Sequence, residues 1–129
     1  LAAVYNREGS PYDAMRESRR AIKIKPDYAP AYAKLGFAQA LMGETDAAIQ
    51  SFRECVRLDP KQSDVLANLA GAYFEKGRDD LAIHYYELAI KIEPNHEATK
   101  RILPLARKRL AERARAIDPT SASQPAPLP

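Results

Sequence analysis

The sequence predicts an all-α fold of stacked helix pairs, and the main evidence is a period of 34 residues. Glycine, proline and alanine each keep that spacing at three positions: Gly9, Gly43 and Gly77; Pro26, Pro60 and Pro94; Ala14, Ala48 and Ala82. A fixed period of this size is typical of arrays in which each unit packs only on its neighbours. Apolar residues between these positions recur at three- and four-residue spacing, which indicates helices with one buried face.

The stretch from Ala31 to Pro60 contains one complete unit. Its aromatic, Leu-Gly, small, aromatic and proline positions are Tyr32, Leu35, Gly36, Gly43, Ala48, Phe52 and Pro60. This pattern resembles the tetratricopeptide repeat (TPR) family. The resemblance implies a right-handed solenoid of helical hairpins, each with a helix A and a helix B, closed by a C-terminal capping helix.

Residues 1–26 are predicted to be a first repeat that lacks its beginning. Leu1 to Glu8 has the pattern of the end of a helix A, and Leu1 is not a starting Met, so we expect the natural protein to continue upstream. Ser10 and Pro11 predict the start of helix B, since serine caps free amide groups and proline is suited to the first helical position. Pro26 predicts its end, because the residue before a proline avoids helical geometry.

Two complete repeats are predicted at 27–60 and 61–94. Their helices are expected over 27–42, 45–58, 63–76 and 79–92. In the first of these pairs one face is apolar, which predicts a buried stripe of Ala47, Ala48, Phe52, Cys55 and Val56. The chain has one cysteine, so it has no internal disulfide, and we interpret Cys55 as a core residue.

The unit 95–117 is predicted to be a capping helix from about Glu97 to Ile117 with Asn95 as its N-cap. Pro104 is expected to kink this helix or to mark its true start, because proline removes one backbone hydrogen bond. The chain has a net charge of +3. Residues 97–117 carry seven basic and two acidic side chains, whereas residues 1–96 are close to neutral. The tail, residues 118–129, contains four prolines and almost no large apolar residue, which predicts disorder.

The sequence offers no catalytic constellation, cofactor loop or metal-ligand cluster, so we predict that the domain is not an enzyme and needs no cofactor or metal. His84 and His96 share no face and have no Ser or Cys partner by spacing, and we interpret both as solvated surface residues. Asp79 and Asp80 are interpreted as favourable charge at a helix N-terminus. The apolar runs are too short to span a bilayer.

The TPR resemblance implies that one side of the helix A row forms a concave groove. A partner would then contact Asn6, Arg7, Lys34, Phe37, Leu41, Asp64, Asn68, Phe74 and Arg101. An apolar floor with a few polar groups suits a peptide or an amphipathic helix of a partner protein, which predicts a scaffold or adaptor. Asp64 argues against the carboxylate clamp of chaperone-binding members, because it would repel a carboxylate.

Four other hypotheses stay open at this point. The basic helix, with Lys100, Arg107, Lys108, Arg109 and Arg113, would suit nucleic acid phosphates or an acidic membrane, although no interleaved aromatic residues offer base stacking. The array could instead regulate a larger enzyme. The incomplete first repeat could dock on a second copy. Phe37 and Phe74 could simply pack between helices. We expect a cytoplasmic location, with any targeting segment upstream of Leu1.

Overall fold

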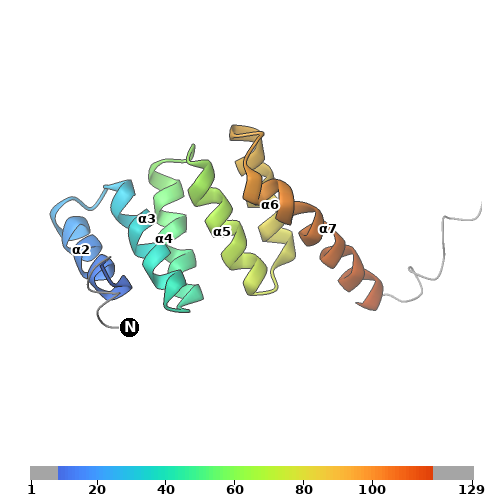
Figure 1. Ribbon diagram of the computed structural model, residues 1–129, viewed down its shortest axis with the longest axis horizontal. Coiled ribbons are helices and arrows are strands. Elements are labelled where there is room, and N and C mark those ends of the chain that lie inside the picture. The colour runs from blue at the N-terminus through green and yellow to red at the C-terminus, as the bar shows by residue number, and fades with distance from the viewer. Residues whose placement is uncertain (1–8, 118–129) are drawn as a thin grey trace, which may run out of the picture.

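The computed structural model describes residues 9–117, and these form a row of helices without a strand (Figure 1). The helices are α2 (Pro11–Ile24), α3 (Ala29–Leu41), α4 (Thr45–Leu58), α5 (Ser63–Glu75), α6 (Asp79–Ile92) and α7 (Glu97–Ile117). Each packs mainly on the helices before and after it in the chain. This arrangement confirms the predicted all-α repeat array. The predicted end of a first helix A and the predicted disordered tail lie outside the described residues.

The turn inside each hairpin explains the spacing of the glycines. Gly9, Gly43 and Gly77 have φ values of 82°, 78° and 78°, in the left-handed region that only glycine adopts at little cost. After α3 the amide of Glu44 donates to the carbonyl of Gln39 at 2.9 Å, which closes the helix end in the Schellman manner. A glycine is therefore needed once per unit, at the same position.

The second kind of turn, between hairpins, depends on proline. Helices α2, α4 and α6 are each followed by one residue in the extended conformation, with φ of −136°, −145° and −130°, and then by a proline. At the start of α2 the Ser10 hydroxyl accepts the amide of Asp13 at 3.2 Å, which confirms the predicted cap. Helix α3 begins at Ala29, two residues later than predicted, because Pro26 and Asp27 belong to this turn.

The core runs along the row between successive helices. Ala48 and Cys55 are 0% exposed and Phe52 is 1% exposed, whereas Val56 is half-buried, so most of the predicted stripe is buried and Cys55 is a core residue. Burying a side chain of the size of Phe52 contributes about 1.5–3 kcal/mol. The alanines allow the paired helices to approach closely. A smaller cluster around Met15 joins α2 to α3.

Helix α7 departs from the sequence prediction at its N-cap. It runs through Pro104 without interruption from Glu97 to Ile117, and the kink stays a prediction. The predicted cap was wrong, because His96 and not Asn95 precedes the helix. The carbonyl of His96 accepts the amide of Lys100 at 3.0 Å, and its ring Nδ1 accepts the amide of Thr99 at 3.4 Å. His96 is 9% exposed and is not a solvated residue, whereas His84 is exposed as predicted.

Candidate functional site

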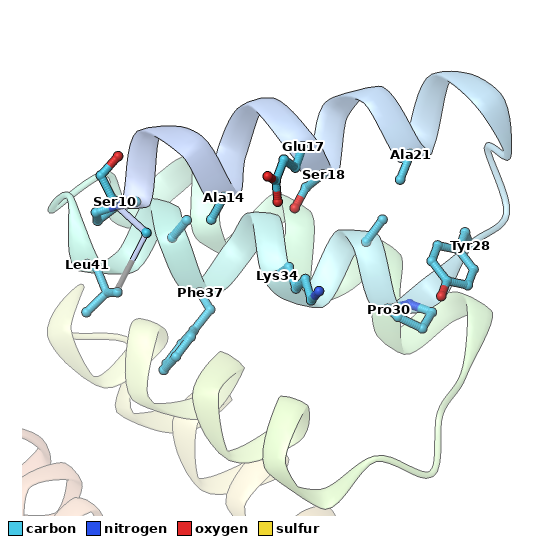
Figure 2. Close-up of a pocket in the computed structure, with 14 residues that line it drawn as sticks. Ser10, Ala14, Glu17, Ser18, Ala21, Tyr28, Pro30, Lys34, Phe37 and Leu41 are labelled. Carbon is cyan, nitrogen blue, oxygen red and sulfur yellow. The ribbon is translucent and has the colours of Figure 1, made fainter. Parts of the chain in front are cut away.

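A first cavity lies between α2 and α3, with a volume of about 510 Å³. Figure 2 shows its two walls, with Ala14, Ser18 and Ala21 on α2 and Lys34, Phe37 and Leu41 on α3. Ala14, Ser18 and Ala21 hold the positions that Ala48, Phe52 and Cys55 hold one period later. The α2 wall is therefore the face that, in the complete hairpin, is covered by the hairpin's own helix A.

Ser18 is the polar group of this wall. It is 3% exposed, and within residues 9–117 its hydroxyl meets no hydrogen-bond partner. The position is filled by the rings of Phe52 and Tyr86 in the later repeats, so a serine leaves space there.

A second cavity, of about 590 Å³, extends from α3 across α5 to the start of α7. Its floor contains Phe52 and Tyr86, which are 1% and 5% exposed. Asp64, Asn68, Gly71 and Glu75 line it from α5. Their spacing of four, three and four residues places them on one face of the helix.

Phe37 lines both cavities and extends from α3 toward α5 (Figure 2). Its side chain is 55% exposed, and Leu41, one turn further along α3, is 66% exposed. Large apolar side chains that stay in water beside concave surface are typical of binding sites. Phe37 therefore separates two neighbouring cavities, the first between α2 and α3 and the second along α3 and α5. We call the surface of these two cavities the groove.

The structure brings most of the predicted groove residues together. Lys34, Phe37 and Leu41 line the first cavity, and Phe37, Asp64 and Asn68 line the second. Phe74 and Arg101 line neither of these two cavities. Asn6 and Arg7 lie outside the described residues. Sequence reasoning did not place Thr45 or His96 in the groove, although both line the second cavity.

The two carboxylates of the second cavity are held by neighbouring side chains. His96 Nδ1 accepts the Thr99 amide, so Nε2 carries the proton and donates to Asp64 Oδ1 at 2.8 Å. Glu75 accepts the Thr45 hydroxyl at 3.4 Å. Burial, and then the negative charge of Glu75, raise the pKa of Tyr86 in the floor. The groove therefore has negative potential at this cavity.

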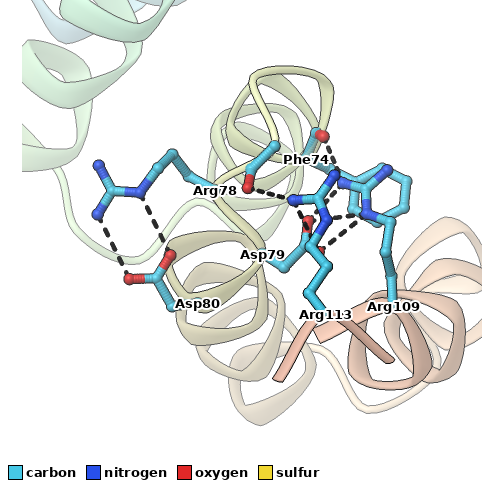
Figure 3. A network of polar contacts seen from close by, with 7 residues as sticks. Phe74, Arg78, Asp79, Asp80, Arg109 and Arg113 are labelled. Atoms are coloured by element: carbon cyan, nitrogen blue, oxygen red, sulfur yellow. Dashed lines mark hydrogen bonds and ion pairs between the residues drawn. The ribbon is translucent and has the colours of Figure 1, made fainter. Parts of the chain in front are cut away.

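A second polar cluster fixes α7 to the third repeat (Figure 3). Arg109 Nε lies 2.9 Å from both carboxylate oxygens of Asp79, and its terminal nitrogen also contacts this carboxylate. Its guanidinium carbon lies 3.5 Å from the ring centroid of Phe74. Arg113 donates to the carbonyl of Gly77 at 2.7 Å and lies 3.4 Å from Asp79. We call these contacts the α7 latch.

The latch changes the interpretation of three predicted residues. Asp79 is 2% exposed, so it is a buried partner of two arginines and more than a surface charge at a helix end. Hydrogen bonding to Asp79 raises the pKa of Arg109 further above its usual range. Phe74 is half-buried beneath Arg109. Arg109 and Arg113 are therefore occupied within the fold, and the basic surface of α7 is smaller than the sequence indicates.

The described residues contain no group of three or more His, Cys, Asp and Glu side chains that could hold a metal ion. Among the helices from α2 to α7, none is long and apolar enough to cross a bilayer. Burial, and then the charge of Asp59, raise the pKa of the Cys55 thiol, which keeps it protonated and unreactive in the core.

Comparisons with known proteins agree with the repeat architecture. Residues 40–103 match the family model described as tetratricopeptide repeat. A crystal structure of MamA has a TM-score of 0.78 and 28% identity, covering 91% of this chain and 68% of that chain. A second MamA structure has a TM-score of 0.77 and 27% identity, covering 96% and 68%. A mutant of the Thermobaculum terrenum O-GlcNAc transferase has a TM-score of 0.72 and 25% identity, covering 81% of this chain and 20% of that one. Among curated proteins no sequence matches.

Proposed function

Because this chain belongs to the tetratricopeptide repeat family, we propose that it is a non-catalytic protein-interaction module whose groove binds a segment of a partner protein. The observation that carries the proposal is Phe37, a phenylalanine 55% exposed between two cavities. Leaving such a ring in water forgoes the stabilisation that its burial would contribute, about 1.5–3 kcal/mol. A bound segment that covers Phe37 and Leu41 recovers part of it.

The lining of the groove supports a peptide or a helix as the bound segment. It combines apolar surface from Phe37 and Leu41 with the polar groups of Lys34 and Asn68. Apolar floors with a few polar groups at their edges bind peptides through one or two anchoring side chains. The partner's anchors would lie on either side of Phe37.

Affinity capture from a native extract tests this proposal. The test variant is Lys34→Ala/Phe37→Ala, and the matched control is Tyr12→Ala/Lys23→Ala. The control removes an exposed aromatic residue and an exposed lysine of α2 that line neither cavity. We expect the test variant alone to lose a partner that the wild-type chain retains at moderate salt.

Two outcomes would contradict the proposal. Equal capture by the test and control variants would place binding away from the groove. Recovery of nucleic acid or lipid alone, at low salt and equally with all forms, would point to the basic helix. The likeness to one fifth of a transferase chain supports a further possibility to be tested on the full-length protein, that the module serves an attached enzyme.

A further inference from the structure

The helix α5 has a gap in the middle of its groove face. Gly71 lies between Asn68 and Glu75, and a Cβ built at Gly71 meets only the Tyr86 hydroxyl, at 3.5 Å. The positions one period earlier and later carry Phe37 and Leu105, which are 55% and 54% exposed. The row of helix A faces therefore shows two large apolar side chains with a hollow between them.

The glycine at this hollow lowers the stability of the fold, although the packing of the helices does not require a glycine there. Glycine inside a helix destabilises a protein by about 0.5–1 kcal/mol relative to alanine. Since 3.5 Å is an ordinary van der Waals contact, an alanine has room at this position. The space above Gly71 belongs to the cavity that Tyr86 and Phe52 also line, and it has room for a side chain supplied by another molecule.

The charged groups around the hollow have one sign. Asp64 and Glu75 lie at the two ends of α5, and no lysine or arginine of the described chain is among the residues that line the second cavity. His96 uses its Nε2 proton on one oxygen of Asp64, whose side chain is 86% exposed. Both carboxylates can therefore accept further hydrogen bonds from a ligand.

The distance between these carboxylates sets the length of a matching segment. Asp64 and Glu75 are eleven residues apart on one helix, so their Cα atoms are about 16 Å apart at 1.5 Å per residue. An extended peptide covers that distance in about five residues. Alternate side chains of an extended peptide point to the same side, so two cationic side chains four or six positions apart would reach both ends of α5 at once.

We propose that the segment bound in the groove is cationic: it places one apolar side chain in the hollow over Gly71 and a lysine or arginine at each end, against Asp64 and Glu75. The inference rests on the proposed function and adds the chemistry of the partner. It excludes ligands that present carboxylates or phosphates to α5, because two negative charges without a facing cation repel them.

The probes are two blocked heptapeptides, acetyl-Arg-Ala-Leu-Ala-Ala-Ala-Arg-amide and the same peptide with glutamate in place of both arginines. Each is titrated into the isotope-labelled chain, and the backbone amide resonances of α3 and α5 are followed. We expect the arginine peptide to shift Asn68 and Gly71 and to saturate. We expect the glutamate peptide to leave both residues unchanged.

Three variants identify the groups that recognise the peptide. Asp64→Asn/Glu75→Gln should weaken the arginine peptide about tenfold, the effect of losing two solvent-exposed ion pairs. Glu54→Gln/Asp80→Asn, which changes the net charge equally at one half-buried and one exposed carboxylate outside the second cavity, should not. Gly71→Ala should weaken the peptide while the fold is retained, because its methyl group enters the hollow.

The outcomes separate this inference from the proposed function. Equal binding of the two peptides, equal effects of the two charge-changing pairs, or no binding of either peptide at millimolar concentration would overturn the cationic partner. In each case the capture experiment with Lys34→Ala/Phe37→Ala still tests whether the groove binds a partner protein. If capture fails and the arginine peptide binds as expected, the groove is a peptide site but not the one that retains a cellular partner.

Discussion

The two glycines inside helices α3 and α5 should respond to alanine in opposite directions. Gly36 and Gly71 both lie within a helix A, where replacing glycine by alanine restricts the unfolded chain and favours the helix. If space allows, each replacement should stabilise the fold by about 0.5–1 kcal/mol. The sign of the effect therefore depends on what the new methyl group meets.

The structure gives different surroundings to these methyl groups. At Gly36 a Cβ would lie 2.8 Å from two ring carbons of Phe52, a residue that is 1% exposed and has little room to move. Overpacking of a core costs about 1–3 kcal/mol, so Gly36→Ala should be destabilising by about 1 kcal/mol net. At Gly71 the nearest atom is the Tyr86 hydroxyl at 3.5 Å, and Gly71→Ala should be stabilising.

Urea unfolding followed by far-ultraviolet circular dichroism measures both effects, since the chain contains no tryptophan to serve as a probe. We expect the midpoint to fall for Gly36→Ala and to rise for Gly71→Ala at an unchanged slope, with the free energies of unfolding about 1.5–2 kcal/mol apart. Adding Phe52→Leu to Gly36→Ala should cost less than Phe52→Leu alone in the wild-type chain. Shifts of the same sign and similar size would refute the reasoning.

The remaining predictions concern the latch, the α7 cap and the buried thiol. Arg109→Met should lower the thermal midpoint and reduce the hydrogen-exchange protection of α7 by about 2–4 kcal/mol, because it removes the main partner of a buried carboxylate. Arg107→Met, which breaks a half-exposed pair, should cost less than about 1 kcal/mol. His96→Ala should cost about 1 kcal/mol in urea unfolding through loss of the cap. The Cys55 thiol should react with a disulfide reagent far more slowly than a free thiol, and at the free rate in urea, because burial raises its pKa.

Most of the fold and part of the groove could be predicted from the sequence, because both depend on the 34-residue period. The turn glycines, such as Gly43, and the prolines that follow helix B fix where helices end, so the predicted bounds are within two residues of the observed ones. The same register placed Lys34, Phe37 and Asn68 on the groove side of their helices, and each lines a cavity. Their binding role stays a prediction.

The polar contacts between helices could not be predicted in the same way, because they depend on side chains that differ from repeat to repeat. Asp79 looked like a charge at a helix end, and only its distance to Arg109 shows that it is a buried partner. The constant separation of the paired residues along the sequence was a signal that could have indicated this contact. Thr45 contacts Glu75 thirty residues on, and Asp79 contacts Arg109 at the same offset. One position of the repeat therefore uses a weak hydroxyl contact in one unit and a charged pair in the next.

Helix α7 lacks the glycine that follows the earlier helices α3 and α5. The period places Ala111 where the earlier units have Gly43 and Gly77 with φ of 78°. An alanine adopts that conformation only at a cost, so the chain continues as a helix, and α7 has 21 residues where α3 and α5 have 13. The extra turns carry Arg113, which reaches the Gly77 carbonyl and Asp79. Because Arg113 lies beyond the position of the missing turn, the longer helix also provides part of the latch that holds α7 in place.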